Sequence, residues 1–427
     1  MKQKESINPN LKALGESATL AMSERVRAMT KQGLEIFNLG IGESPFPVPN
    51  FIVESLKTHA QERSYLPVKG LPELRNAVSA YHKRQDGIDF KPDNILIGPG
   101  TKILMYLLQL SHDSELVVPS PCWVSYVPQA NLLGKKVQLI QTSFEDKWHL
   151  SADKLAEACE TDPSKPRLLV LNYPGNPDGG TYSEEELKAI AEVARKYEMV
   201  LLSDEIYGEM HHKGQHVSIS KFYPEGTIIS SGLSKWAAAG GWRLGTFAFP
   251  EELGWLLGPM TKAAGQTYSS VASPIQWAGV TAFNGGTELD NYLIHTRRIL
   301  KKLSANCANM LRESGARIHQ SEGAFYLFPD FTPFAENLAK RGIRSGKELG
   351  EAILNETHVA TIPGVSFFRP AEELTLRMSY TNFDGTKAMK ASEAIPIDQA
   401  LPDSFLEEYC GKTLEATRKI CDFVTKT

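Results

Sequence analysis

The sequence predicts an α/β protein, in which helices cover both faces of a mostly parallel sheet, together with a second, smaller α+β domain. The chain has 427 residues, and because a single hydrophobic core rarely extends beyond about 250–300 residues, two folding units are expected. Short apolar runs alternate with helical patterns through the middle of the chain. This alternation is typical of parallel strands connected by helices.

Five apolar runs in the middle of the chain predict buried strands. They cover residues 94–97, 116–118, 168–171, 199–202 and 227–229. A helix is expected over residues 101–110. Another helix begins after Ser183, because Glu186 follows three residues later and completes a capping box. The carboxyl ends of parallel strands gather at one edge of the sheet, where ligands bind.

The two ends of the chain have a different pattern. The region after about residue 300 carries amphipathic helices and a strand over 374–380 whose side chains alternate between apolar and polar. A long helix over 292–315 is expected to connect the two domains. We therefore assign residues 48–295 to the large domain, and residues 1–47 together with 296–427 to the small domain.

Composition and charge exclude several classes of protein. The apolar fraction is 42%, the charged fraction is 22% and the net charge is −4, all ordinary for a globular chain that binds neither nucleic acid nor an anionic membrane. The segment from Met1 to Asn10 is polar and does not predict a signal peptide. A basic cluster is expected to be a solvated helix face; it consists of Arg297, Arg298, Lys301 and Lys302.

Cysteines and histidines give no metal or disulfide pattern. The chain has five scattered cysteines, which is typical of reduced thiols in the cytoplasm. His211, His212 and His216 cluster in one loop, but no acidic or cysteine partner completes a recognised set of ligands. We therefore expect these three histidines to lie on the surface, and we expect no metal site.

Two glycine-rich segments are candidates for phosphate binding. Residues 39–45 begin like a dinucleotide fingerprint, but Pro45 stands where the third glycine is needed, which argues against NAD. At residues 98–102 a predicted strand ends, glycines turn the chain and a helix begins with free backbone N–H groups. This second segment fits a phosphate cradle, but taken alone it is better explained as a simple strand-to-helix turn.

Four further segments carry polar side chains just after predicted strands or close to them. They are residues 172–179, 203–207, 230–235 and 240–245, and they bring an asparagine, an aspartate, a tyrosine, a lysine and an arginine to the same edge of the sheet. This set suits pyridoxal phosphate, which needs a lysine amine, an acid beside its pyridine nitrogen, and donors and cations for its oxygens. Each residue alone has a structural explanation, but the four segments together favour a site.

With these motifs the chain resembles the class I/II aminotransferases of pyridoxal-phosphate fold type I, and in particular the aspartate aminotransferase-like members. The resemblance runs from about residue 17 to residue 379. It implies a seven-stranded, mostly parallel sheet between helices in the large domain. It also implies a homodimer with shared active sites that moves an amino group between an L-amino acid and a 2-oxo acid such as 2-oxoglutarate.

The resemblance also implies a role for each matching residue. Lys235 matches the lysine that bonds to the cofactor and moves the substrate proton, Asp204 matches the partner of the pyridine nitrogen, and Tyr207 and Asn176 match the donors to the ring hydroxyl oxygen. The remaining cofactor contacts implied are Trp123 on the ring, and Gly100, Thr101, Lys102, Ser234, Arg243 and the other subunit's Tyr65 at the phosphate. The implied substrate contacts are Arg377 and Gly42 at the α-carboxylate, with Asn176 and Trp123 beside them.

The chain departs from the family pattern at several places. Gly232 stands where a serine is frequent, Asp178 replaces a threonine, and the tail over 387–411 has no obvious counterpart. Some acid-specific relatives have a lysine at the position of Thr101, whereas here the lysine is Lys102, which we expect to point away along the helix. We therefore expect activity on aspartate or glutamate with tolerance of neutral or aromatic side chains.

Two alternatives to an aminotransferase share this scaffold. A carbon–sulfur β-lyase or a cyclising synthase would use the same cofactor residues. A non-catalytic regulator would attach a DNA-binding module, and the sequence has no basic module of that kind.

Overall fold

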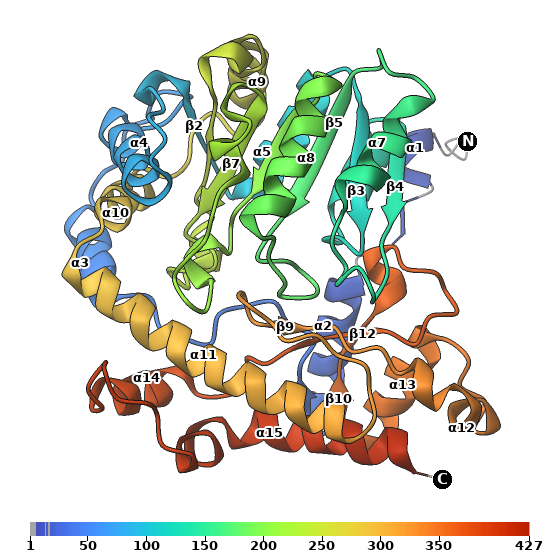
Figure 1. Cartoon of the computed structure of the whole chain (residues 1–427). Coiled ribbons are helices and arrows are strands. Elements are labelled where there is room, and N and C mark those ends of the chain that lie inside the picture. Colours follow the sequence, from blue (N-terminus) through green and yellow to red (C-terminus); the bar gives the residue numbers. More distant parts are fainter. Residues whose placement is uncertain (1–5, 13, 16–17, 427) are drawn as a thin grey trace, which may run out of the picture.

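The computed structural model describes residues 6–12, 14–15 and 18–426 and contains a seven-stranded sheet with strand order β2-β8-β7-β6-β5-β3-β4 (Figure 1). Strands β3 to β7 run parallel to one another, and β8 is antiparallel to both β2 and β7. The strands are β2 (Ile95–Gly98), β3 (Glu115–Ser120), β4 (Val137–Gln141), β5 (Arg167–Asn172), β6 (Val200–Asp204), β7 (Thr227–Gly232) and β8 (Gly245–Ala248). The predicted α/β fold and its five strands are confirmed.

Helices cover both faces of this sheet. On one face the core contains residues of α5 (Thr101–Ser111), α6 (Tyr126–Leu132) and α9 (Gly254–Thr267), and on the other it contains α7 (Ala152–Glu160) and α8 (Glu184–Lys196). Strand β5 shows why its central residues, Leu168 to Leu171, are all apolar. Leu168 and Val170 pack on the first face, whereas Leu169 and Leu171 pack on the second.

The predicted start of α8 is confirmed in atomic detail. The side chain of Ser183 accepts a hydrogen bond from the backbone N–H of Glu186, and the side chain of Glu186 accepts one from the N–H of Ser183. This capping box satisfies two backbone donors that would otherwise lack partners.

A second group of elements packs below the sheet in Figure 1 and combines both ends of the chain. Near the N-terminus, β1 (Phe37–Asn38) pairs in parallel with β10 (Val359–Ala360). A three-stranded sheet forms from β9 (Tyr326–Leu327), β11 (Ile362–Pro363) and β12 (Leu376–Ser379).

The remaining α-helices of the described residues, in both parts of the molecule, are α1 (Pro9–Lys12), α2 (Ala18–Lys31), α3 (Asn50–Thr58), α4 (Pro72–Asp86), α10 (Ser273–Asn284), α11 (Thr287–Glu313), α12 (Ala335–Lys340), α13 (Gly346–Thr357), α14 (Gly385–Glu393) and α15 (Ser404–Thr425).

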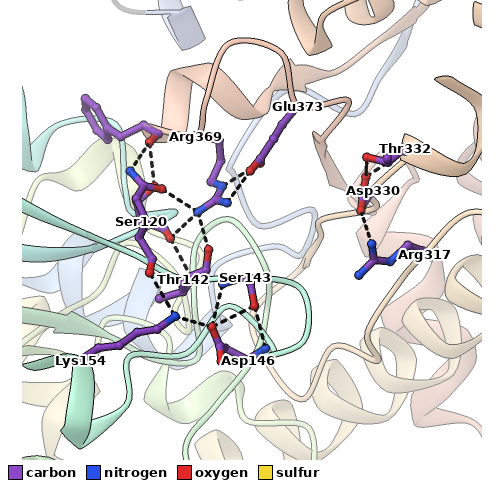
Figure 2. A network of polar contacts seen from close by, with 12 residues as sticks. Ser120, Thr142, Ser143, Asp146, Lys154, Arg317, Asp330, Thr332, Arg369 and Glu373 are labelled. Carbon is purple, nitrogen blue, oxygen red and sulfur yellow. Dashed lines mark hydrogen bonds and ion pairs between the residues drawn. The ribbon is translucent and has the colours of Figure 1, made fainter.

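A buried arginine connects the C-terminal region to the edge of the large sheet (Figure 2). The guanidinium of Arg369 donates to the carbonyl oxygens of Ser120 and Thr142 at 2.8 and 2.9 Å, and it pairs with Glu373 at 2.6 Å. Because Ser120 ends β3, this contact fixes the end of that strand against the segment that follows β11. Charge-assisted bonds of this kind are stronger and more directional than neutral ones.

The expectation that the basic cluster on α11 is a solvated helix face is wrong. Arg298 donates to the carbonyl oxygens of Ile395 and Pro396 at 2.8 and 3.0 Å, and to the side chain and carbonyl of Ser392. Lys302 pairs with Asp403 at 2.9 Å, and Arg297 pairs with Glu209 at 2.6 Å. Arg298 and Lys302 therefore bind the tail over 387–411 and Arg297 binds Glu209, partners that sequence spacing alone does not show, whereas Lys301 is exposed as expected.

An Arg298→Ala variant should lower the free energy of unfolding by roughly 1–3 kcal/mol, because several carbonyl oxygens lose a charged donor. Chemical denaturation of the cofactor-free protein measures this change. Lys301→Ala is the matched control, since Lys301 is an exposed residue of the same cluster. Equal effects of the two substitutions would show that the contacts to the tail do not stabilise the fold.

The structure also shows the state of the cysteines and the apolar character of the helices. All five cysteines are free and buried, as predicted for structural thiols. Among the residues that the structure describes, no helix has the length and apolar character needed to cross a membrane.

Candidate active site

Lys235 lies just beyond the carboxyl end of β7, with its amine turned inward. Its Nζ donates to the carbonyl oxygen of Gly42 at 2.6 Å and lies 5.5 Å from the ring centre of Tyr207 and 5.8 Å from that of Phe325. Burial, followed by the nearby charge of Arg377, lowers the pKa of Lys235 to about 8. A neutral amine, which can act as nucleophile or base, is therefore available near neutral pH.

Asp204 ends β6 and is buried. The hydroxyl of Tyr126 donates to Oδ2 at 2.5 Å, and the hydroxyl of Ser230 donates to Oδ1 at 3.2 Å. Burial raises the pKa of Asp204 to about 6, and these two hydrogen bonds oppose that increase. The carboxylate is thus anionic at neutral pH and held in one orientation. Tyr126 is a site residue that the sequence analysis did not identify.

Hydrogen bonds connect Asp204 to Arg377 through two asparagines. Asn172 donates from its side chain to the carbonyl oxygen of Asp204 at 2.8 Å and accepts from the backbone N–H of Asn176 at 2.9 Å. Arg377, on β12, donates to the side-chain oxygen of Asn176 at 3.2 Å and to the carbonyl oxygen of Gly40 at 2.6 Å. Its Nε is buried and has no partner among the described residues. The buried guanidinium therefore keeps donor capacity for an anion.

Two tyrosines line the space between Lys235 and Arg377. The hydroxyls of Tyr207 and Tyr326 are 2.8 Å apart, and the guanidinium of Arg377 lies 4.8 Å from the ring centre of Tyr326. A Cβ on Gly42 would lie 2.5 Å from the Tyr326 hydroxyl, so this close approach requires glycine. The sequence analysis did not find Tyr326, because it lies on a two-residue strand outside the four motifs.

The start of α5 has the geometry of an anion site. Gly100 has a φ of +84°, which favours glycine, and a Cβ there would lie 2.2 Å from Nη2 of Arg243. Arg243 donates to the carbonyl oxygen of Gly240 at 2.8 Å and lies beside the helix N-terminus at Thr101. Backbone N–H groups and a guanidinium therefore converge at one place.

The structure also places the residues at the margins of this site. Ser234 is half-buried, beside Lys235. Lys102 does not point away along α5, since its Nζ lies 5.1 Å from the ring centre of Trp123, and both side chains line a groove of about 900 Å³ that Arg243 also borders. Tyr65 is 94% exposed, so it does not reach the site of its own chain.

The structure gives a steric reason for glycine at position 232, where the family frequently has a serine. A Cβ at this position would lie 2.6 Å from the carbonyl oxygen of Leu244 and 2.9 Å from the Cα of Gly245. These are backbone atoms of the adjacent segment, which pairs with β7 through β8. The chain therefore has no room for a serine at this position.

The expectation that His211, His212 and His216 lie on the surface is wrong. His211 and His212 are each 7% exposed, and burial lowers the pKa of both to about 4. His216 is bound to the carboxylate of Glu205 at 2.9 Å. Within the described residues no group of histidine, cysteine, aspartate and glutamate side chains has the arrangement of a metal site. The turn after β6 folds back into the protein, which local spacing did not reveal.

Comparison with known proteins assigns the chain to a family. The sequence model of "Aminotransferase class I and II" matches residues 35–395. Aspartate aminotransferase of Bacillus sp. (strain YM-2) is 32% identical over 88% of this chain and 95% of its own length. Asparagine–oxo-acid transaminase of Streptococcus mutans is 32% identical over 90% of this chain and 96% of its own length.

Solved structures agree with this assignment. Aspartate aminotransferase from Thermus thermophilus with maleate superposes with a TM-score of 0.81 at 27% identity, over 91% of this chain and 98% of that chain. Aromatic aminotransferase from Pyrococcus horikoshii superposes with a TM-score of 0.76 at 27% identity, over 94% and 98% of the two chains. The matches in sequence and in fold cover most of the chain, which belongs to the class I and II aminotransferase family and is an aminotransferase.

Proposed function

We propose that the chain is a pyridoxal-phosphate-dependent aminotransferase that moves an amino group between an L-amino acid and a 2-oxo acid. The observation that carries the proposal is the inward-facing amine of Lys235, whose pKa is lowered to about 8 and on which the charges of the buried Asp204 and Arg377 act. An amine of this kind can bond to a carbonyl carbon and move a proton.

The residues present fit pyridoxal phosphate at each of its functional groups. Gly100, Thr101 and Arg243 offer an anion site for the phosphate, with Ser234 and Lys102 beside it. The anionic carboxylate of Asp204 suits a protonated pyridine nitrogen, and Tyr207 and Asn176 offer hydrogen-bond donors for the ring hydroxyl oxygen. Trp123 offers an aromatic face for the ring.

The roles of the chain's own groups follow from this arrangement. When bound, pyridoxal phosphate supplies an electron-accepting ring that stabilises negative charge on the substrate Cα. Lys235 removes the Cα proton as general base and later returns a proton as general acid. The carboxylate of Asp204 stabilises a positive charge on a neighbouring group, because a buried anion attracts a cation strongly where the dielectric constant is low.

Arg377 and Gly42 are proposed to bind the α-carboxylate of the substrate. The guanidinium of Arg377 is buried and oriented by Asn176 and Gly40, and such a fork can bind a carboxylate with two hydrogen bonds. Substrate specificity is proposed to be aspartate-like or broad, with 2-oxoglutarate as the oxo acid. Two observations support this breadth: the Lys102 amine offers a positive charge, and the adjoining groove of about 900 Å³ has room for larger side chains.

Quaternary structure and location are part of the proposal. A large aromatic side chain as exposed as Tyr65 suits an interface, so we propose a homodimer in which Tyr65 contacts the phosphate site of the other subunit. The division into residues 48–295 and the combined segments 1–47 and 296–427 is proposed as the domain organisation, although residues 1–5, 13, 16, 17 and 427 lie outside those described. The cytoplasm is the proposed location.

An isotope-transfer assay tests the proposed reaction. The purified enzyme is given ¹⁵N-labelled aspartate, glutamate, alanine or phenylalanine, each with and without 2-oxoglutarate or oxaloacetate. An aminotransferase should place the label in the amino acid derived from the added oxo acid. An S-substituted cysteine labelled with ¹⁵N is added as a fifth substrate: breakage of its Cβ–S bond with release of a thiol and labelled ammonia, without an oxo acid, would instead indicate the lyase alternative. Among the other four, aspartate or glutamate should be the best donors.

A further inference from the structure

Asp178, which replaces the threonine of the family pattern, folds back over its own loop. This loop is closed by hydrogen bonds from Gly175 N–H to the Gly180 carbonyl at 2.8 Å and from Gly179 N–H to the Gly175 carbonyl at 2.9 Å. The Oδ2 of Asp178 accepts from Gly180 N–H at 2.9 Å, and its Oδ1 would lie 2.1 Å from a Cβ on Gly175. The carboxylate is therefore an integral part of the turn that carries Asn176.

A histidine faces this carboxylate from the segment before α7. A Cβ on Gly180 would lie 2.4 Å from Oδ2 of Asp178 and 3.1 Å from Nε2 of His149, so both side chains approach this glycine. On its other side, Nδ1 of His149 lies 3.4 Å from the carboxylate of Glu186. The imidazole also stacks on Tyr182 at 4.5 Å. His149, oriented by Glu186 of α8, thus lies near the Asp178 carboxylate, and the two residues are referred to below as the Asp178–His149 pair.

The pair adjoins the active site through a small cavity. This cavity has a volume of about 20 Å³, which is enough for one water molecule, and its lining includes Asp178, His149, Asn172, Asn176 and Tyr126. His319 is a further titratable group whose charge acts on Asp178. These residues connect the loop with the asparagine that orients Arg377 and with the tyrosine that binds Asp204.

Asp178 has an energetic cost that its structural role alone does not explain. Burial raises the pKa of Asp178, which means that the fold disfavours the charged carboxylate, although His149 and the Gly180 N–H reduce the penalty. An asparagine would keep the acceptor for Gly180 N–H without carrying a charge. A residue that costs stability while it supports a functional loop is a familiar trade-off in active sites.

We propose that Asp178 is a positioning residue for transamination: its carboxylate, paired with His149, holds the loop that places the Asn176 amide and thereby orients Arg377 for the substrate carboxylate. The inference rests on the proposed function for the role of Arg377. Its effect is on substrate binding, because the fork formed by Arg377 is held through Asn176 at 3.2 Å.

The test compares Asp178→Asn with wild type in two measurements. In steady-state assays with aspartate and 2-oxoglutarate, KM for both substrates should rise roughly tenfold, while kcat should change by less than about threefold, as expected when uniform binding is lost. In thermal unfolding of the cofactor-free protein at pH 8, the variant should melt a few degrees higher than wild type, since it lacks a buried charge. As the pH falls and Asp178 takes up a proton, this advantage should disappear.

His149→Gln and the double variant identify the pair. His149→Gln should raise KM by a similar factor, and adding Asp178→Asn to it should give no further increase, because both changes remove one interaction. Asp153→Asn, which alters an exposed aspartate of α7, is the matched control and should change neither KM nor melting temperature.

Two outcomes would overturn the inference. An unchanged KM in Asp178→Asn, or in His149→Gln if the first variant fails to fold, would show that the pair does not position Asn176. A higher KM accompanied by a lower melting temperature at pH 8 would show that Asp178 is only a structural residue of the turn. Absence of amino transfer in wild type would contradict the proposed function, while the unfolding measurement would still report on the buried charge.

Discussion

A Lys235→Ala variant should lose amino transfer by roughly four orders of magnitude or more, because the group that bonds to the cofactor and the general base disappear together. Lys235 is the lysine whose amine contacts Gly42 and lies near the rings of Tyr207 and Phe325. The purified wild type should be yellow from bound cofactor, and the variant should lack the absorbance that depends on the lysine.

Two further variants distinguish the role of the Lys235 amine from that of its positive charge and from the general effect of removing a lysine. Lys235→Arg keeps a cation in place but has no amine with a pKa near 8, so it should be as inactive as Lys235→Ala. Lys188→Ala removes an exposed lysine of α8 and should retain wild-type turnover. Near-native turnover in Lys235→Ala would refute both the proposed cofactor attachment and the proposed base.

The sequence predicted the strands at the centre of the sheet because both of their faces are buried. In β5, alternate residues from Leu168 to Leu171 pack against different helical layers, so these four positions are all apolar and form a clear run. Strand β4 was missed because it lies at the edge and only Ile140 of its residues is buried. Strand β8 was missed because it is only four residues long and begins with glycine at the site's close approach.

The sequence predicted those site residues that the order of the parallel strands brings to one edge of the sheet. Asp204 and Lys235 follow parallel strands, so their meeting at one edge follows from topology. Contacts that depend on tertiary packing were not predictable. Tyr126 donates to Asp204 from α6, and Arg298 binds the distant tail over 387–411. The local sequence around these two residues does not identify their partners.

An Asp204→Asn variant should keep its fold and yet lose roughly 10²–10⁴ in turnover, a range typical of groups that act on proton distribution at the reacting centre. The amide has the same shape: its oxygen can still accept from one of the two hydroxyls, Tyr126 or Ser230, and its NH2 group can donate to the oxygen of the other, so the geometry of the site should persist. It has no negative charge to favour a protonated pyridine nitrogen, without which the ring accepts electrons poorly. Asp204→Glu should recover part of the loss, whereas equal activity of the Asn and Glu variants would show that Asp204 only ends its strand.

The pH dependence of the stability of the cofactor-free protein tests the state of Asp204 independently of activity. Burial raises the pKa of Asp204 from an ordinary 3.8 to about 6, so the folded protein binds this proton more tightly than the unfolded chain does. The contribution of Asp204 to stability is therefore favourable below the ordinary value and is lost as the pH rises to about 6. Asp204→Asn should consequently be more stable than wild type at pH 8, with the difference shrinking towards pH 4, as measured by denaturant unfolding. A difference that does not depend on pH would mean that the carboxylate is not held as a buried anion, and the proposed role of Asp204 beside the pyridine nitrogen would lose its physical basis.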